Sequence, residues 1–213
     1  MFKWPTIGEI INSYKEGWSI FVSSLAVNLY TATNIVVLGM LTNNVIVGYY
    51  SAADKLIICV RRGIYAVSDA IYPFISKMMK DDIPKGLQFI KKQLFLYLIV
   101  GLVGCTSLFF FSDIIVKLLF GADYNLTVDV LRILSFVPLA VAISTVFGEE
   151  TMLPLNMNSA YSRTLVLAAF FSLLSIFPLC YLWGAKGVAM TMLLTEFLIM
   201  IIMGGLLRKQ LFQ

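Results

Sequence analysis

The fold class of this chain is decided by residues 164–207, TLVLAAFFSLLSIFPLCYLWGAKGVAMTMLLTEFLIMIIMGGLL. They form two apolar runs, 164–183 and 184–207, and each run has about the 20 residues that a helix needs to cross a membrane. The join, Trp183-Gly184-Ala185-Lys186-Gly187, has room only for a very short turn. We therefore expect two membrane-spanning helices packed as a tight hairpin.

Four more apolar runs precede this hairpin. The 213 residues are 60% hydrophobic and 13% charged, whereas soluble domains are about 45–50% apolar and about 25% charged. The sequence therefore predicts an all-α membrane protein, a bundle of six transmembrane helices. The first four expected spans are Trp18 to Leu41, Val47 to Ile75 (the most polar), Gln93 to Phe111 and Thr127 to Phe147.

The segments outside the spans are short. Residues 1–17 carry apolar side chains at helical spacing and predict an amphipathic helix at the membrane interface. Residues 112–126 predict a second interfacial helix, which should end at Gly121. The expected organisation is an interfacial segment 1–17, a bundle 18–207 and a cytoplasmic tail 208–213.

Orientation follows from the lysine and arginine residues between the spans, which favour the cytoplasmic side. If both termini lie inside, only Lys117 and Lys186 fall in outside segments. The inside segments then hold Lys3, Lys15, Lys77, Lys80, Lys85, Lys91, Lys92, Arg163, Arg208 and Lys209. The sequence therefore predicts an N-in, C-in bundle, and its net charge of +4 needs no nucleic-acid partner.

The composition argues against an enzyme. The chain has no histidine, and its cysteines, Cys59, Cys105 and Cys180, are isolated in apolar stretches. Histidine is the commonest general base and metal ligand in proteins, and no glycine-rich phosphate loop occurs. We expect a transporter with no catalytic residues, no metal site and no cofactor.

The second expected span carries the main candidate site. Its ionisable residues Asp54, Lys55, Arg61, Arg62 and Asp69 fall within about 140° of a helical wheel. Asp54 and Asp69 lie seven or eight residues from the two arginines, too far for pairing along one helix. The partners must be another helix, water or a charged substrate. An interhelical polar core, a solvated path for an anionic cargo and a misplaced span all fit, and the path is the preferred interpretation.

Other polar residues extend this site. Tyr65 and Tyr72 share the charged arc, and Asn28 and Asn34 lie on one face of the first span, where they line the same cavity or lock helix packing. Glu196 is the lone acid of the last span. It either relays protons or, as the preferred interpretation, forms an ion pair with one of the arginines.

The order of several short motifs resembles a known family. They are Lys15-Glu16-Gly17-Trp18, Val47-Gly48-Tyr49-Tyr50-Ser51-Ala52-Ala53-Asp54-Lys55, Ala70-Ile71-Tyr72-Pro73, Leu118-Leu119-Phe120-Gly121, Val130-Leu131-Arg132-Ile133-Leu134, Leu153-Pro154-Leu155 and Gly184-Ala185-Lys186-Gly187-Val188-Ala189. This series resembles the O-antigen and polysaccharide flippases of the multidrug/oligosaccharidyl-lipid/polysaccharide exporter superfamily, and in particular their C-terminal six-helix lobe.

The resemblance implies movement of an undecaprenyl-pyrophosphate-linked oligosaccharide across a bacterial inner membrane. Arg61 and Arg62 would meet the anionic head group, with Lys55, Tyr65, Tyr72, Asn28 and Asn34 as further substrate-binding candidates. Transport in the superfamily is often coupled to an ion gradient, so Asp54, Asp69 and Glu196 are candidates for binding a proton or sodium. The expected partners are the lipid-linked oligosaccharide, membrane lipids, and an N-terminal lobe or a second copy of this chain.

The length departs from the family, because its members have about twelve spans. A fragment, a truncated reading frame or a half-transporter that dimerises would each account for this. Three rival functions stay open at this point: a drug or cation antiporter of the same superfamily, a membrane enzyme acting on polyprenol-linked sugars, and a non-transporting assembly subunit. The sequence does not identify the sugars or the coupling ion.

Overall fold

A computed structural model describes residues 7–121 and 123–212, and over those residues the chain is helical without a strand. The expected spans fall on the observed helices, except that the fourth, Thr127 to Phe147, is divided between two helices and the sixth begins one residue before its helix. Several helices extend beyond the apolar runs. The elements are α1 (Ile7–Leu41), α2 (Asn44–Asp81), α3 (Ile83–Phe120), α4 (Asn125–Leu134), α5 (Val137–Phe147), the π-turn η1 (Gly148–Met152), α6 (Asn158–Trp183) and α7 (Ala185–Phe212).

The helices α2 and α3 begin at polar caps. The Asn43 side chain accepts hydrogen bonds from the backbone N–H groups of Val45 and Ile46, at 3.1 and 3.0 Å. The Asp82 carboxylate accepts one from Lys85 at 3.2 Å. Each cap satisfies N–H groups that a helix start leaves without a partner. The first helix, α1, is continuous across the predicted boundary between residues 17 and 18. Residues 1–6 of the predicted interfacial segment lie outside the described part.

The separate interfacial helix predicted over 112–126 is wrong. Helix α3 continues without a break to Phe120, and an Asp113–Lys117 ion pair at 2.8 Å spans one turn of it. Its 38 residues extend about 57 Å, far more than the roughly 30 Å hydrocarbon layer. One helix can therefore cross the membrane and project from it. The predicted end at Gly121 is confirmed, since Gly121 has a φ of 100°, which suits glycine.

The most buried span is the broken one formed by α4, α5 and η1. It occupies the interior: 72% of its most apolar window is buried, against 6% for α3. The break between α4 and α5 precedes Pro138, which lies in the first turn of α5, as expected for a residue that removes a helix hydrogen bond. The span extends past Phe147 through Met152. Glu149 and Glu150, expected outside the spans, therefore lie inside the bundle.

The predicted hairpin of the last two spans is confirmed. Only Gly184 separates α6 from α7, and its φ of 56° is accessible to glycine at little cost. A side chain at Gly187 would overlap the backbone carbonyl of Leu179. The two glycines therefore permit the close approach of these helices.

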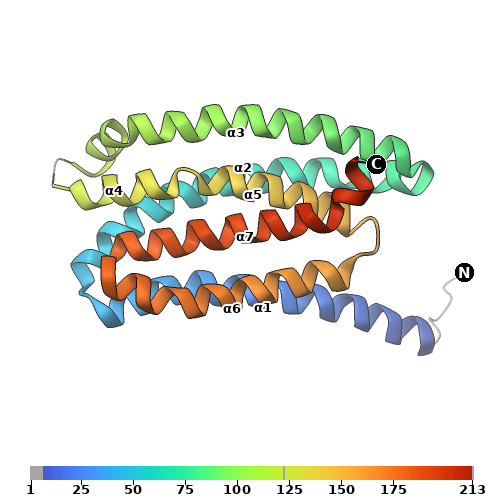
Figure 1. The fold of residues 1–213 in the computed structure, drawn as a ribbon, viewed down its shortest axis with the longest axis horizontal. Coiled ribbons are helices and arrows are strands. Elements are labelled where there is room, and N and C mark those ends of the chain that lie inside the picture. Colours follow the sequence, from blue (N-terminus) through green and yellow to red (C-terminus); the bar gives the residue numbers. More distant parts are fainter. Residues whose placement is uncertain (1–6, 122, 213) are drawn as a thin grey trace, which may run out of the picture.

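The elements lie roughly parallel to one long axis (Figure 1). α3 forms one edge and the paired α1 and α6 form the other, with α7 between α6 and the α2, α4 and α5 layer. The chain reverses direction between successive spans, with α4, α5 and η1 forming one of them, so the start of α1 and the end of α7 lie toward the same end (Figure 1). This arrangement places α2 against the interior helices.

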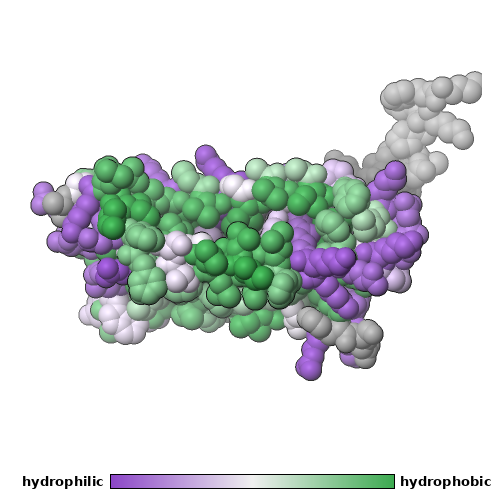
Figure 2. All heavy atoms as spheres, turned by 90° about the horizontal axis from the view of Figure 1, so that it is seen from above, coloured by the Kyte–Doolittle hydropathy of each residue, from purple (hydrophilic) through white to green (hydrophobic). Residues whose placement is uncertain are grey.

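The surface has an apolar middle and polar ends (Figure 2). The helix α3 contributes much of the apolar band, with Phe95, Leu96, Ile99, Val103 and Phe110 exposed. Within the described ranges, five helical segments are long and apolar enough to cross a membrane: Phe21–Leu41, Ile83–Phe120, Asn125–Met152, Asn158–Trp183 and Ala185–Leu211. The charged helix α2 is not among them. The chain is therefore a multi-pass membrane protein in which α2 is more polar than the other long helices.

Candidate functional site

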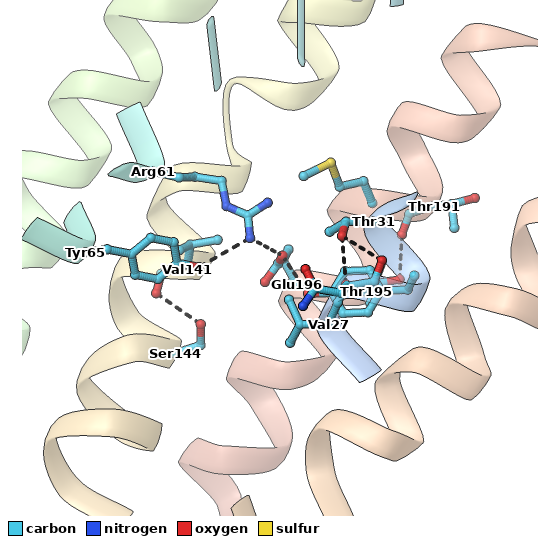
Figure 3. Close-up of polar contacts among 12 residues, drawn as sticks. Val27, Thr31, Arg61, Tyr65, Val141, Ser144, Thr191, Thr195 and Glu196 are labelled. Carbon is cyan, nitrogen blue, oxygen red and sulfur yellow. Dashed lines mark hydrogen bonds and ion pairs between the residues drawn. The ribbon is translucent and has the colours of Figure 1, made fainter. Parts of the chain in front are cut away.

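The charged face of α2 turns one arginine into the bundle. Arg61 is 8% exposed, and its Nη2 lies 3.3 Å from Oε1 of Glu196 on α7. The same nitrogen donates to the Tyr65 hydroxyl at 3.3 Å, one turn along α2. On α1, Tyr30 donates its hydroxyl to Glu196 Oε1 at 3.1 Å. These contacts join α1, α2 and α7 through polar groups (Figure 3).

A small cleft, with a volume of about 50 Å³, opens beside this ion pair. Arg61 and Tyr65 reach toward it from α2 and Glu196 from α7, and Ser144 lies near them on α5 (Figure 3). The polar lining consists of Tyr30, Arg61, Tyr65, Ser144, Thr145, Glu149, Tyr161 and Glu196. Three of these residues, Arg61, Tyr65 and Glu196, were site predictions.

The other predicted residues of α2 lie elsewhere. Lys55, Arg62 and Asp69 are exposed, and Asp54 and Tyr72 are half-buried. None of the five lines the cleft. The single charged arc predicted from the helical wheel therefore divides into a buried part around Arg61 and an exposed part, because a helix buries only the stripe that faces its neighbours.

The two asparagines of the first span also separate. Asn28 is exposed, and its amide donates to the Ser24 carbonyl of its own helix at 2.9 Å. Asn34 is buried, and its Oδ1 has no hydrogen-bond partner. Neither side chain lines the cleft.

Sequence reasoning missed Tyr30, Glu149 and Tyr161 as members of the site. The apolar run of the fourth expected span ends at Phe147, so the sequence pattern places Glu149 in the connection that follows. A usable signal was present: Thr145 and Glu149 are four residues apart, which places them on one helical face. Tyr30 had no comparable signal, because an isolated tyrosine in an apolar helix is typical of ordinary packing.

The chemistry of the cleft is that of ionic and hydroxyl recognition. Its ionisable groups are one guanidinium and two carboxyl groups, and hydroxyls from α1, α2, α5 and α6 surround them. Arginine can bind a phosphate through two parallel hydrogen bonds, but Arg61 makes only one contact to Glu196. Within the described residues, no group of three histidine, cysteine, aspartate or glutamate side chains could hold a metal ion.

The described residues thus form a multi-pass helical bundle with a buried, charged cleft. Residues 1–79 match the family model described as "Polysaccharide biosynthesis protein". Together with the relatives described next, this match supports the resemblance to polysaccharide and O-antigen flippases that the sequence motifs indicated.

Two relatives match nearly the whole chain. One, from Escherichia coli (strain K12), is provisionally named an O-antigen transporter and is 32% identical over 91% of this chain and 47% of its own length. Another, of the same name from Shigella dysenteriae, is 29% identical over 92% of this chain and 48% of its own length. The chain thus spans about half the length of these curated relatives. No solved structure matches.

Proposed function

We propose that this chain is one six-span bundle of a flippase in the bacterial inner membrane. Its cargo would be an undecaprenyl-pyrophosphate-linked oligosaccharide, moved from the cytoplasmic to the periplasmic leaflet. Support comes from the transporter names of both relatives and from the apolar band between polar ends. The distribution of lysine and arginine along the sequence supports an N-in, C-in orientation in which α2 also crosses the membrane, in addition to the five apolar segments.

The observation that carries this proposal is the buried guanidinium of Arg61 beside a cleft. A phosphate group entering the cleft would compete with Glu196 for Arg61 and could form two hydrogen bonds where the carboxylate forms one. The Tyr30 and Tyr65 hydroxyls would bind phosphate or sugar oxygens. Lys55 and Arg62, exposed on the same helix, would attract the anionic head group from a distance.

The direct test removes the pair while leaving no buried charge unpaired. We expect R61Q/E196Q, introduced into the chromosomal gene, to abolish surface polysaccharide and to cause lipid-linked intermediates to accumulate. The matched control is D113N/K117Q, which neutralises an exposed ion pair on α3 and should leave the polysaccharide unchanged. Normal polysaccharide in R61Q/E196Q, at a normal protein level, would refute the proposal.

The proposed partner is an N-terminal bundle or a second copy of the chain. Lys55, Arg62 and Asp69 are exposed on α2, and a second bundle facing them would enclose them in a shared cavity. The intact mass of the protein expressed from its own chromosomal gene, with a tag at its C-terminus, distinguishes the two arrangements. A mass near 23.8 kDa plus the tag favours a second copy, and one about twice as large favours a linked bundle.

A second function is favoured by the charge of the cleft itself. Glu149 and Glu196 outnumber Arg61 there, which suits a cationic cargo better than an anionic one. A cation antiporter would keep normal polysaccharide in the R61Q/E196Q strain and would export a cationic dye from proteoliposomes. In such proteoliposomes, E149Q should then lower dye export, whereas a flippase should export no dye.

A further inference from the structure

Glu150 is a second buried acid in the bundle, separate from the cleft. It belongs to the π-turn η1 and its exposed fraction is 0%. The amide of Gln93 on α3 donates to Glu150 Oε2 at 2.6 Å. The hydroxyl of Ser68 on α2 is another hydrogen-bonding neighbour. Glu150 therefore lies between α2, α3 and the interior span.

The surroundings of Glu150 contain no compensating positive charge. Among the salt bridges of residues 7–121 and 123–212, none includes Glu150. Helix α5 carries no titratable residue. The titratable groups near the π-turn include Tyr65 and Asp69 from α2, Tyr97 from α3, Tyr161 from α6, and Glu149 itself. The Arg61 guanidinium shares the cleft with Glu149, but its ion pair is with Glu196 and not with Glu150. A carboxylate at this place would be a buried, unpaired charge among other acids, which is strongly unfavourable.

Two oxygen atoms of the Glu150–Gln93 pair have no partner. They are Glu150 Oε1 and Gln93 Oε1, and both are buried. An ionised carboxylate and an amide oxygen only accept hydrogen bonds, so they cannot satisfy each other. A single proton on Glu150 turns its carboxyl group into a donor. An acid and an amide already joined through N–H can then form a second bond, O–H to O.

The π-turn carries both Glu149 and Glu150, whose side chains have different neighbours. The Leu153 N–H bonds to the Gly148 carbonyl five residues back, at 3.1 Å. A Cβ on Gly148 would come within 2.6 Å of the Tyr161 ring, so packing against α6 fixes the turn. Neighbouring residues of a helix point in different directions. Glu149 accordingly lines the cleft, whereas Glu150 bonds to Gln93 on α3.

We infer that Glu150 is a proton-binding site, uncharged in the state described here. Loss of the proton to water leaves a carboxylate whose hydration requires α2, α3 and the π-turn to separate. If the proposed function holds, this site would couple proton movement to the rearrangement of the bundle. The protonation itself does not depend on any transport activity.

Infrared difference spectroscopy of the whole chain in lipid nanodiscs tests this inference. At neutral pH the wild-type protein should show a protonated-carboxyl band that E150Q lacks. The matched control D113N, which changes an exposed acid of α3, should keep the band. Gln93→Leu removes the amide partner and should shift the frequency of the band, which gives an independent reading if E150Q fails to fold.

Two results would overturn the inference. One is the absence of a carboxyl band that depends on Glu150 or Gln93. The other is a gain in thermal stability of the wild type in sodium over potassium that E150Q loses, because this would assign the site to a metal cation. Neither result bears on transport. If the Glu150-dependent carboxyl band is present but R61Q/E196Q keeps normal polysaccharide, only the proposed function is refuted.

Discussion

Glu196 and Glu150 are both buried glutamates in membrane-spanning segments, and their surroundings differ in one respect. Glu196 meets Arg61 and the Tyr30 hydroxyl, whereas Glu150 meets a neutral amide and a neutral hydroxyl. A charged partner compensates a buried carboxylate, whereas two neutral partners leave its charge uncompensated. Two residues of one type can therefore serve as a fixed charge and as a proton-binding group.

The same Glu→Gln change should have its largest effect at position 196. E196Q leaves the Arg61 guanidinium buried without a counter-charge, so we expect a loss of about 3–5 kcal/mol in the free energy of unfolding. Detergent-induced unfolding measures this loss, and R61Q/E196Q should recover most of it. If E196Q is as stable as the wild type, the ion pair is not maintained in the membrane.

Removal of the phenol that supports Glu196 should cost less. Tyr30→Phe deletes one hydrogen bond to the carboxylate at 3.1 Å without creating a buried charge. We expect a loss of about 1–2 kcal/mol in the free energy of unfolding. A hydrogen bond to a charged acceptor is stronger than the average hydrogen bond between membrane helices. In the R61Q/E196Q background, Tyr30→Phe should lower the free energy of unfolding by a smaller amount. An equal loss in both backgrounds would contradict the idea that Tyr30 stabilises the protein through Glu196.

At position 150 the change should be small. Glutamine replaces a neutral acid by a neutral amide of nearly the same shape, so E150Q should unfold within about 1 kcal/mol of the wild type. The measurement is the same unfolding titration used for E196Q. A loss as large as that of E196Q would mean that Glu150 carries a charge, and the contrast between the two glutamates would disappear.

The smallest effect concerns an acid outside the spans. Hydrogen bonds from Lys85 hold the pKa of Asp82 below its usual value. An acid whose folded pKa is lowered adds stability above its unfolded pKa, about 3.9, and this stability is lost as the pH falls through the folded pKa. Asp82→Asn should therefore flatten the acid limb of stability slightly. An unchanged acid limb would show that Asp82 does not contribute.

Much of the bundle could be predicted from the sequence because apolar length is a local property. The six runs, the hairpin at Gly184 and the helix end at Gly121 all follow from residues close together in the chain. The prediction over 112–126 was wrong because Ser112 and Asp113 interrupt the apolar run without interrupting the helix. Glu149 and Glu150 were assigned to a connection for the same reason, since hydropathy marks where apolar residues stop and not where a helix stops.

The sequence by itself determined that this chain is a multi-pass helical protein with a charged second span, and its motifs indicated the family. Only the tertiary structure decided which of those charges are buried and what each one meets. Arg61 and Arg62 are neighbours in the chain, yet one is paired inside the bundle and the other is exposed. The reason is physical: burial and pairing depend on residues far away in the sequence, such as Glu196 for Arg61 and Gln93 for Glu150.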